Sequence, residues 1–136
     1  MLFLGHVAIS LALADATDSD RAATVAGNLL PDVVDKTLGW VLHVTPSGRA
    51  LAHGLPFLSL TVVVARALLS TRSWRGVAVG YLGHLIADLY GGGQVTWLAP
   101  FRPHPPRKRE PFLTLKALPP EVIGAVVIWR LLRRSS

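Results

Sequence analysis

The stretch GYLGHLIADLYGGG, residues 80–93, places a histidine and an aspartate four positions apart inside an otherwise apolar run. The run does not alternate with period two and is long enough for a helix, so His84 and Asp88 would lie on one helical face. The GGG at 91–93 then ends this helix. The two side chains either bond each other as buried polar groups or form one edge of a metal site.

Three further apolar runs accompany this one, and their lengths also indicate helices. We predict four helices in all, at residues 2–14, 50–69, 76–90 and 119–132. The breaks between them contain DATDSDR at 15–21, TPSG at 45–48 and a basic turn, TRSWR, at 71–75. A short apolar stretch at 22–30 ends at Pro31 and leads into a short helix or loop carrying P-D-x-x-D. The prediction is an all-α single domain over residues 1–136, with a basic, proline-rich loop at 102–111.

The composition favours a polytopic membrane protein. The chain is 51% hydrophobic and 16% charged, with a mean hydropathy of +0.43, whereas soluble domains carry about 25% charged residues. The predicted helices have almost no polar face, which a helix in a soluble bundle needs. Only residues 50–69 reach the roughly 20 apolar residues of a simple span, so a soluble helical bundle remains the alternative.

Four spanning helices would place residues 15–49 and 91–118 on one side of the membrane, and 71–75 with both termini on the other. More Lys and Arg residues lie on the first side, which weakly favours that side as cytoplasmic. We therefore expect a multi-pass membrane protein, with lipid as its partner. The net charge of +6 does not indicate nucleic acid binding, because the basic loop has no interleaved aromatic residues.

The predicted topology gathers histidine and aspartate side chains at one end of the bundle. The candidates, from four segments, are His6, Asp32, Asp35, His53, His84 and Asp88. Since the chain has no cysteine, only imidazole nitrogens and carboxylate oxygens could hold a metal. Such ligands suit a divalent ion, with zinc first and manganese or iron next. The set could hold one ion or two, and two ions about 3.5–4 Å apart are common in phosphoesterases.

Simpler interpretations exist for each candidate. A single histidine on an apolar helix, such as His6, is more often a hydrogen-bonded core residue than a ligand. Asp32 follows Pro31 and would also suit a turn or a helix cap.

Three segments of the sequence resemble the YdjM-type family of predicted inner-membrane, metal-dependent hydrolases, also described as LexA-binding. The segments are GNLLPDVVD at 27–35, RALAHG at 49–54 and GYLGHLIADLYGGGQVTWLAPF at 80–101. The resemblance implies that all six candidates fall on the family's motif positions. A more distant similarity links the P-D and H-x-x-x-D elements to zinc-dependent phospholipases C.

The chain departs from the family pattern at four positions. Lys36 and Gly48 stand where histidines are common, and Ala52 and Gly54 replace a threonine and a serine. These departures remove groups that could orient or extend a metal site.

These observations predict a membrane-bound metal-dependent hydrolase acting on an ester or phosphoester, with a small molecule or a lipid as substrate. Asp35 would be the general base and Arg49 would hold a phosphate. The main alternative is a non-catalytic membrane scaffold or regulator with a structural metal or polar cluster. A transporter or channel subunit is a further alternative, although its ligands would be expected near the midplane.

Overall fold

The computed structural model describes residues 3–45, 50–90, 97–101 and 118–134. In order, its elements are α1 (Phe3–Ala16), α2 (Arg21–Lys36), the π-helical turn η1 (Thr37–Val41), α3 (Leu55–Leu68), α4 (Thr71–Tyr90) and α5 (Leu118–Arg134). The described residues contain no strand, so the predicted all-α class is confirmed for that part of the chain. The predicted loop at 102–111, the GGG stop and Arg49 lie outside the described residues.

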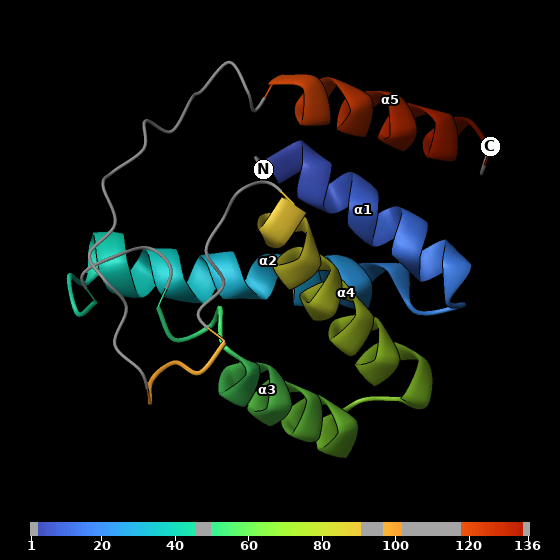
Figure 1. The fold of residues 1–136 in the computed structure, drawn as a ribbon. Helices are drawn as coiled ribbons and strands as arrows, with labels where there is room; N and C mark the ends of the chain where they lie inside the picture. Colours follow the sequence, from blue (N-terminus) through green and yellow to red (C-terminus); the bar gives the residue numbers. More distant parts are fainter. Residues whose placement is uncertain (1–2, 46–49, 91–96, 102–117, 135–136) are drawn as a thin grey trace.

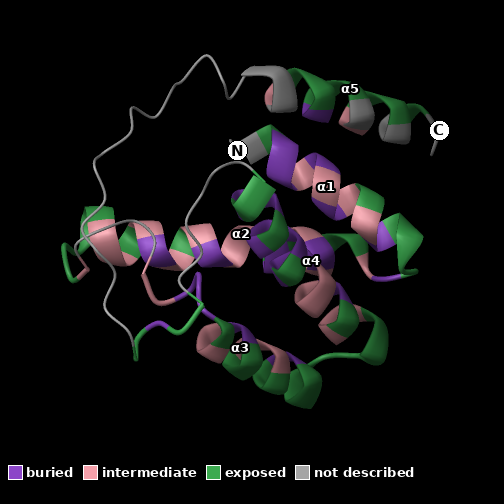
Figure 2. Ribbon diagram, in the orientation of Figure 1, coloured by how far each residue is buried: buried purple, intermediate pink, exposed green. Residues whose placement is uncertain are grey.

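Helices α2 and α4 cross at the centre of the molecule, with α1 and α3 packed around them and α5 beside α1 (Figure 1). Buried residues concentrate where α1, α2 and α4 meet, while α3 and α5 expose many of their side chains (Figure 2). The core is unusually polar, since its fully buried side chains include three histidines and two aspartates. The packing of the helices thus surrounds a buried set of titratable groups.

The prediction that Pro31 ends an apolar stretch before a short helix or loop is wrong, because α2 continues through Pro31 to Lys36. Asp20 caps its first turn by accepting a hydrogen bond from the Ala23 amide at 2.7 Å. An interior proline costs a helix about 3 kcal/mol, and here Pro31 is buried in the helix packing. Packing of α2 against the other helices therefore outweighs the tendency of Pro31 to end a helix.

The prediction that 71–75 forms a turn is also wrong. These residues form the start of α4, and Ser70 stands before them as a capping residue whose hydroxyl accepts from the Ser73 amide. Conversely, residues 50–54 do not belong to the predicted helix 50–69, and α3 begins at Leu55 with a proline in its first turn.

Because α2 is a full helix, the predicted placement of the connections must be corrected. Arg72 donates to the Asp18 carboxylate at 2.8 Å, and the Asp20 amide donates to the Arg72 carbonyl at 3.3 Å. The α1–α2 and α3–α4 connections therefore lie at the same end of the bundle, and not at opposite ends. No helix of the described residues combines the length and hydrophobicity needed to cross a bilayer.

Helix α5 packs on α1 through its first turns. The Glu121 carboxylate accepts hydrogen bonds from the amides of Leu4, at 2.8 Å, and Gly5, at 3.3 Å. A carboxylate at this position satisfies free donors of the first turn of α1 and opposes its dipole favourably. Gly124 permits the contact, since a Cβ there would lie 2.9 Å from the Leu4 carbonyl oxygen.

Close contact between α2 and α4 depends on glycines. A Cβ on Gly80 would lie 2.0 Å from the Thr24 carbonyl oxygen, and one on Gly27 would lie 2.3 Å from the Val77 carbonyl oxygen. These are backbone atoms of the facing helix, so no side-chain rotation can relieve the clash. The two helices can approach this closely only because both positions lack a side chain.

We expect Gly80→Ala to lower the free energy of unfolding by about 2–3 kcal/mol, since it forces α2 and α4 apart. Gly83→Ala is the matched control on the same helix. Its Cβ would meet the flexible end of Leu13 at 2.5 Å, and alanine is the better helix former. Thermal unfolding of both variants in one detergent tests this, and equal midpoints would contradict the glycine argument.

Candidate metal centre

Four side chains from three segments direct carboxylate oxygens and imidazole nitrogens toward one point. Asp32 comes from α2, His53 from the turn before α3, and His84 and Asp88 from successive turns of α4. The Nε2 atoms of His53 and His84 are 3.2 Å apart. Asp88 Oδ2 lies 3.5 Å from His53 Nε2 and 3.7 Å from His84 Nε2. Asp32 Oδ1 completes the set at 3.7 Å and 4.0 Å from the same two nitrogens.

These separations suit a single metal ion. A tetrahedral zinc site with bonds of 2.0–2.1 Å has ligand atoms about 3.3–3.4 Å apart. The triplet of His53, His84 and Asp88 is close to this spacing, whereas Asp32 is the more distant member. The residues present therefore fit a divalent ion, and the pairing of His84 with Asp88 along α4 supplies one edge of the site.

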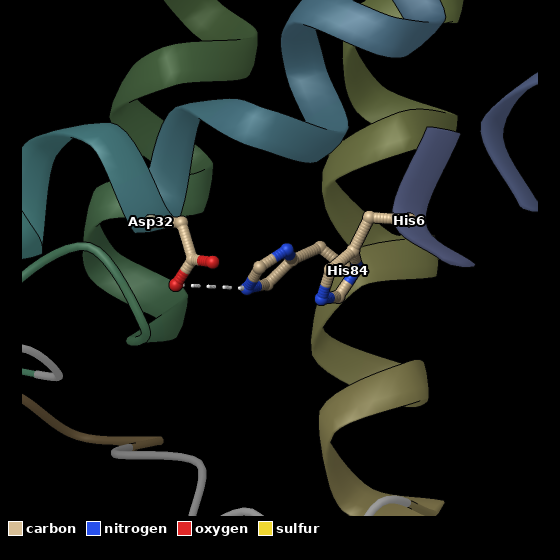
Figure 3. A group of neighbouring side chains, drawn as sticks. All are labelled: His6, Asp32 and His84. Atoms are coloured by element: carbon tan, nitrogen blue, oxygen red, sulfur yellow. Dashed lines mark ion pairs between the residues drawn. The ribbon is translucent and has the colours of Figure 1, made fainter. Parts of the chain in front are cut away.

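His6 lies on the far side of the His84 ring. The two rings stack with centroids 4.4 Å apart and planes inclined by 16°, and Asp32 points toward His84 from the opposite side (Figure 3). His6, Asp32 and His84 form a second group whose potential ligand atoms lie within 4.8 Å of one another. His6 is buried, and neither of its ring nitrogens has a hydrogen-bond partner among the described residues.

Asp35 is placed differently from the other candidates. Its carboxylate accepts from the backbone amides of Ala50, at 2.7 Å, Leu51, at 3.0 Å, and Ala52, at 2.9 Å. It also lies 2.7 Å from Nδ1 of His53. A carboxylate accepts, so Nδ1 carries the proton and Nε2 presents its lone pair to the cluster. Such an orienting carboxylate is the usual partner of a metal-binding histidine.

The electrostatics of the aspartates follow from these contacts. Burial alone would raise the pKa of Asp35, but hydrogen bonds from His53 and the Ala52 and Ala50 amides hold it below its ordinary value. Burial likewise opposes ionisation of Asp32, and the hydrogen bond and charge of Lys36 lower its pKa. Both carboxylates are therefore anionic at neutral pH.

The carboxylates in turn favour a cation at His53. Burial would lower the pKa of its imidazole, yet the hydrogen bonds and charges of Asp35 and Asp88 raise it above the ordinary value. A divalent ion on Nε2 would satisfy the same preference for positive charge.

Three residues that bear on the site were not singled out as candidates from the sequence. Tyr81 is fully buried, and its hydroxyl donates to the Ala52 carbonyl beside His53. Lys36 pairs with Asp32 at 2.5 Å. Asn28 is buried, and its side-chain amide has no hydrogen-bond partner among the described residues. Asn28 and Lys36 each lie four positions from Asp32, and this spacing was the signal available in the sequence.

Taken together, the fold and the cluster define an all-helical protein with a buried histidine–aspartate centre able to hold a metal. A comparison with protein families matches the family described as YdjM inner membrane protein over residues 1–134. The chain belongs to this family. No curated protein and no solved structure matches the chain, so the similarity to zinc-dependent phospholipases C stays a prediction.

We predict that Asp35→Asn lowers the free energy of unfolding by about 3 kcal/mol, because a buried anion that pairs with His53 and the 50–53 amides is lost. Asp15→Asn is the control, since it alters an ion pair with Arg21 at the surface. Chemical denaturation in detergent measures both. Equal stability of the two variants would show that the Asp35 contacts do not hold this turn.

Proposed function

We propose that the protein is a membrane-bound, metal-dependent hydrolase whose centre is formed by His53, His84 and Asp88. The main support is that the ligand atoms of these three residues lie 3.2–3.7 Å from one another. The Asp35 carboxylate also accepts a hydrogen bond from the other ring nitrogen of His53. When bound, a divalent ion such as zinc supplies an activated water and stabilises developing negative charge. Membership of the family supports the membrane location and does not by itself carry the activity.

Asp32 is better placed than Asp35 to act as the general base. Asp35 is committed to His53 and to several backbone amides, which leaves it poorly suited to accept a further proton. Asp32 Oδ1 has no hydrogen-bond partner among the described residues and faces both ring nitrogens, and its side chain is 16% exposed. We therefore assign proton transfer to Asp32 and orientation of His53 to Asp35.

The substrate proposed is an ester or phosphoester, and lipid-derived molecules are the first class to test. Lys36 carries a positive charge beside Asp32 with its side chain 37% exposed, where a substrate anion could approach. The role predicted for Arg49 in holding a phosphate lies outside the described residues.

Metal content and activity together distinguish a catalytic centre from a closed structural site. We expect wild-type protein to contain about one divalent ion per chain and His84→Ala to lose it, as expected for removal of a ligand. Asp32→Asn should keep the ion and lose at least about 100-fold in hydrolysis, the scale of a lost general base. Elemental analysis and assays with phospholipids, phosphodiesters and carboxylic esters provide the readouts.

The matched control is Asp18→Asn, an exposed aspartate whose backbone φ of +48° is one that asparagine also tolerates. It should retain both the ion and the activity. Loss of the ion from Asp32→Asn would instead mean four protein ligands and a structural centre, which favours the scaffold alternative. Equal ion content in wild type and His84→Ala would exclude the site.

Membrane attachment is proposed to use the apolar surfaces of α3 and α5. Exposed large side chains on these helices include Leu60, Val63, Leu68, Val122, Ile123 and Val126. Exposed apolar side chains in such numbers are expected to contact lipid or another protein, and membership of an inner-membrane family favours lipid. The multi-pass arrangement is the more specific form of this proposal.

Single cysteines test the multi-pass arrangement cleanly, because the chain has none of its own. Asp18 and Val44 lie beyond opposite ends of α2, and both are exposed. In oriented membrane vesicles, a multi-pass arrangement in which α2 spans the bilayer should let an impermeant maleimide reach Asp18→Cys and Val44→Cys from opposite sides. Labelling of both from the same side would contradict it, and labelling after detergent lysis controls for reactivity.

A further inference from the structure

We propose that the Lys36 ammonium is the resident second cation of the cluster and limits it to a single divalent metal ion. The inference builds on the metal centre of the proposed function. It assigns a role to a lysine that the sequence marked only as a departure from the family pattern.

The first argument is that the two carboxylate oxygens of Asp32 face different partners. Oδ1 faces the Nε2 atoms of His53 and His84 at 3.7 Å and 4.0 Å. Oδ2 is taken by Lys36 Nζ at 2.5 Å. In a two-metal site the ions lie about 3.5–4 Å apart and share such ligands. The ammonium occupies the side of Asp32 from which a second ion would be held.

The second argument is that Asp35 is not free to replace Asp32 in this role. Its oxygens accept from the His53 ring and from the amides of the turn that precedes α3. Recruiting Asp35 to a second ion would break several of these hydrogen bonds and release the turn. His6 could bind a second ion only together with Asp32 and His84, and both of these residues already face the first centre.

The third argument is the balance of charge. The cluster contains three carboxylates, Asp32, Asp35 and Asp88, and the latter two are almost completely buried. With neutral imidazoles, one divalent ion and the Lys36 ammonium offset these three negative charges. With the Lys36 ammonium in place, a second divalent ion would bring five positive charges against three negative ones, one more uncompensated charge than two ions would give without Lys36. Each such charge is costly in a medium of low dielectric constant.

The fourth argument is that Lys36 is held in place. It lies one turn after Asp32 on α2, with which it forms an i,i+4 pair. Nζ also stands 5.8 Å from the centroid of the Trp40 ring, which belongs to the π-helical turn η1. The ammonium therefore contacts both a carboxylate and an aromatic face.

Metal stoichiometry tests the proposal without depending on turnover. Wild type, Lys36→Met, Lys36→Gln and Lys36→Arg would be stripped with a chelator and dialysed against increasing zinc, then analysed for zinc and protein. We expect wild type and Lys36→Arg to saturate at about one zinc per chain. Lys36→Met and Lys36→Gln should each take up about one more ion. Two neutral replacements guard against a folding defect in either one.

The double variant Lys36→Met/Asp32→Asn locates the additional ion, because without a charged Asp32 the second zinc should not bind. Wild type that saturates at two ions per chain would overturn the Lys36 assignment while leaving the metal centre intact. Lys36→Met and Lys36→Gln that both saturate at one ion, as wild type does, would also overturn it. Wild type that binds no zinc would overturn the centre itself, so the two failures are distinguishable.

Discussion

The contact between α2 and α4 is the constraint on which the rest of the structure depends. Gly27 and Gly80 bring the two backbones so close that each would clash with a single added carbon. This approach sets Asp32 of α2 opposite His84 and Asp88 of α4. The cluster is therefore positioned by rigid helices, and a loss of close packing would separate its ligand atoms before any of them was altered.

A second constraint fixes the segment that is not helical. Residues 50–53 precede α3, and their backbone amides donate to the Asp35 carboxylate. The same carboxylate orients the His53 ring, so one anion shapes both a backbone turn and the tautomer of a candidate ligand. Tyr81 secures the turn from the α4 side through the Ala52 carbonyl.

The sequence predicted the helical class and the shared face of His84 and Asp88, because both follow from periodicity within one segment. It did not predict α2 as a continuous helix, since the local signal of Pro31 is a break and only tertiary packing overrides it. That error displaced the α1–α2 connection to the wrong end of the bundle. The grouping of distant side chains was inferred from topology, but the separate position of Asp35 depends on side-chain geometry that no spacing reveals.

The Glu121 carboxylate of α5 caps the first turn of α1 and so connects the two ends of the described chain. His6 stacks on His84 from α1, and the first turn of that helix is completed by a carboxylate 117 positions later in the sequence. During synthesis, the amino-terminal helix must therefore wait for almost the entire polypeptide before it acquires this partner. The carboxylate cap on α1 can form only after residue 121 has been made, long after His84, on which His6 stacks.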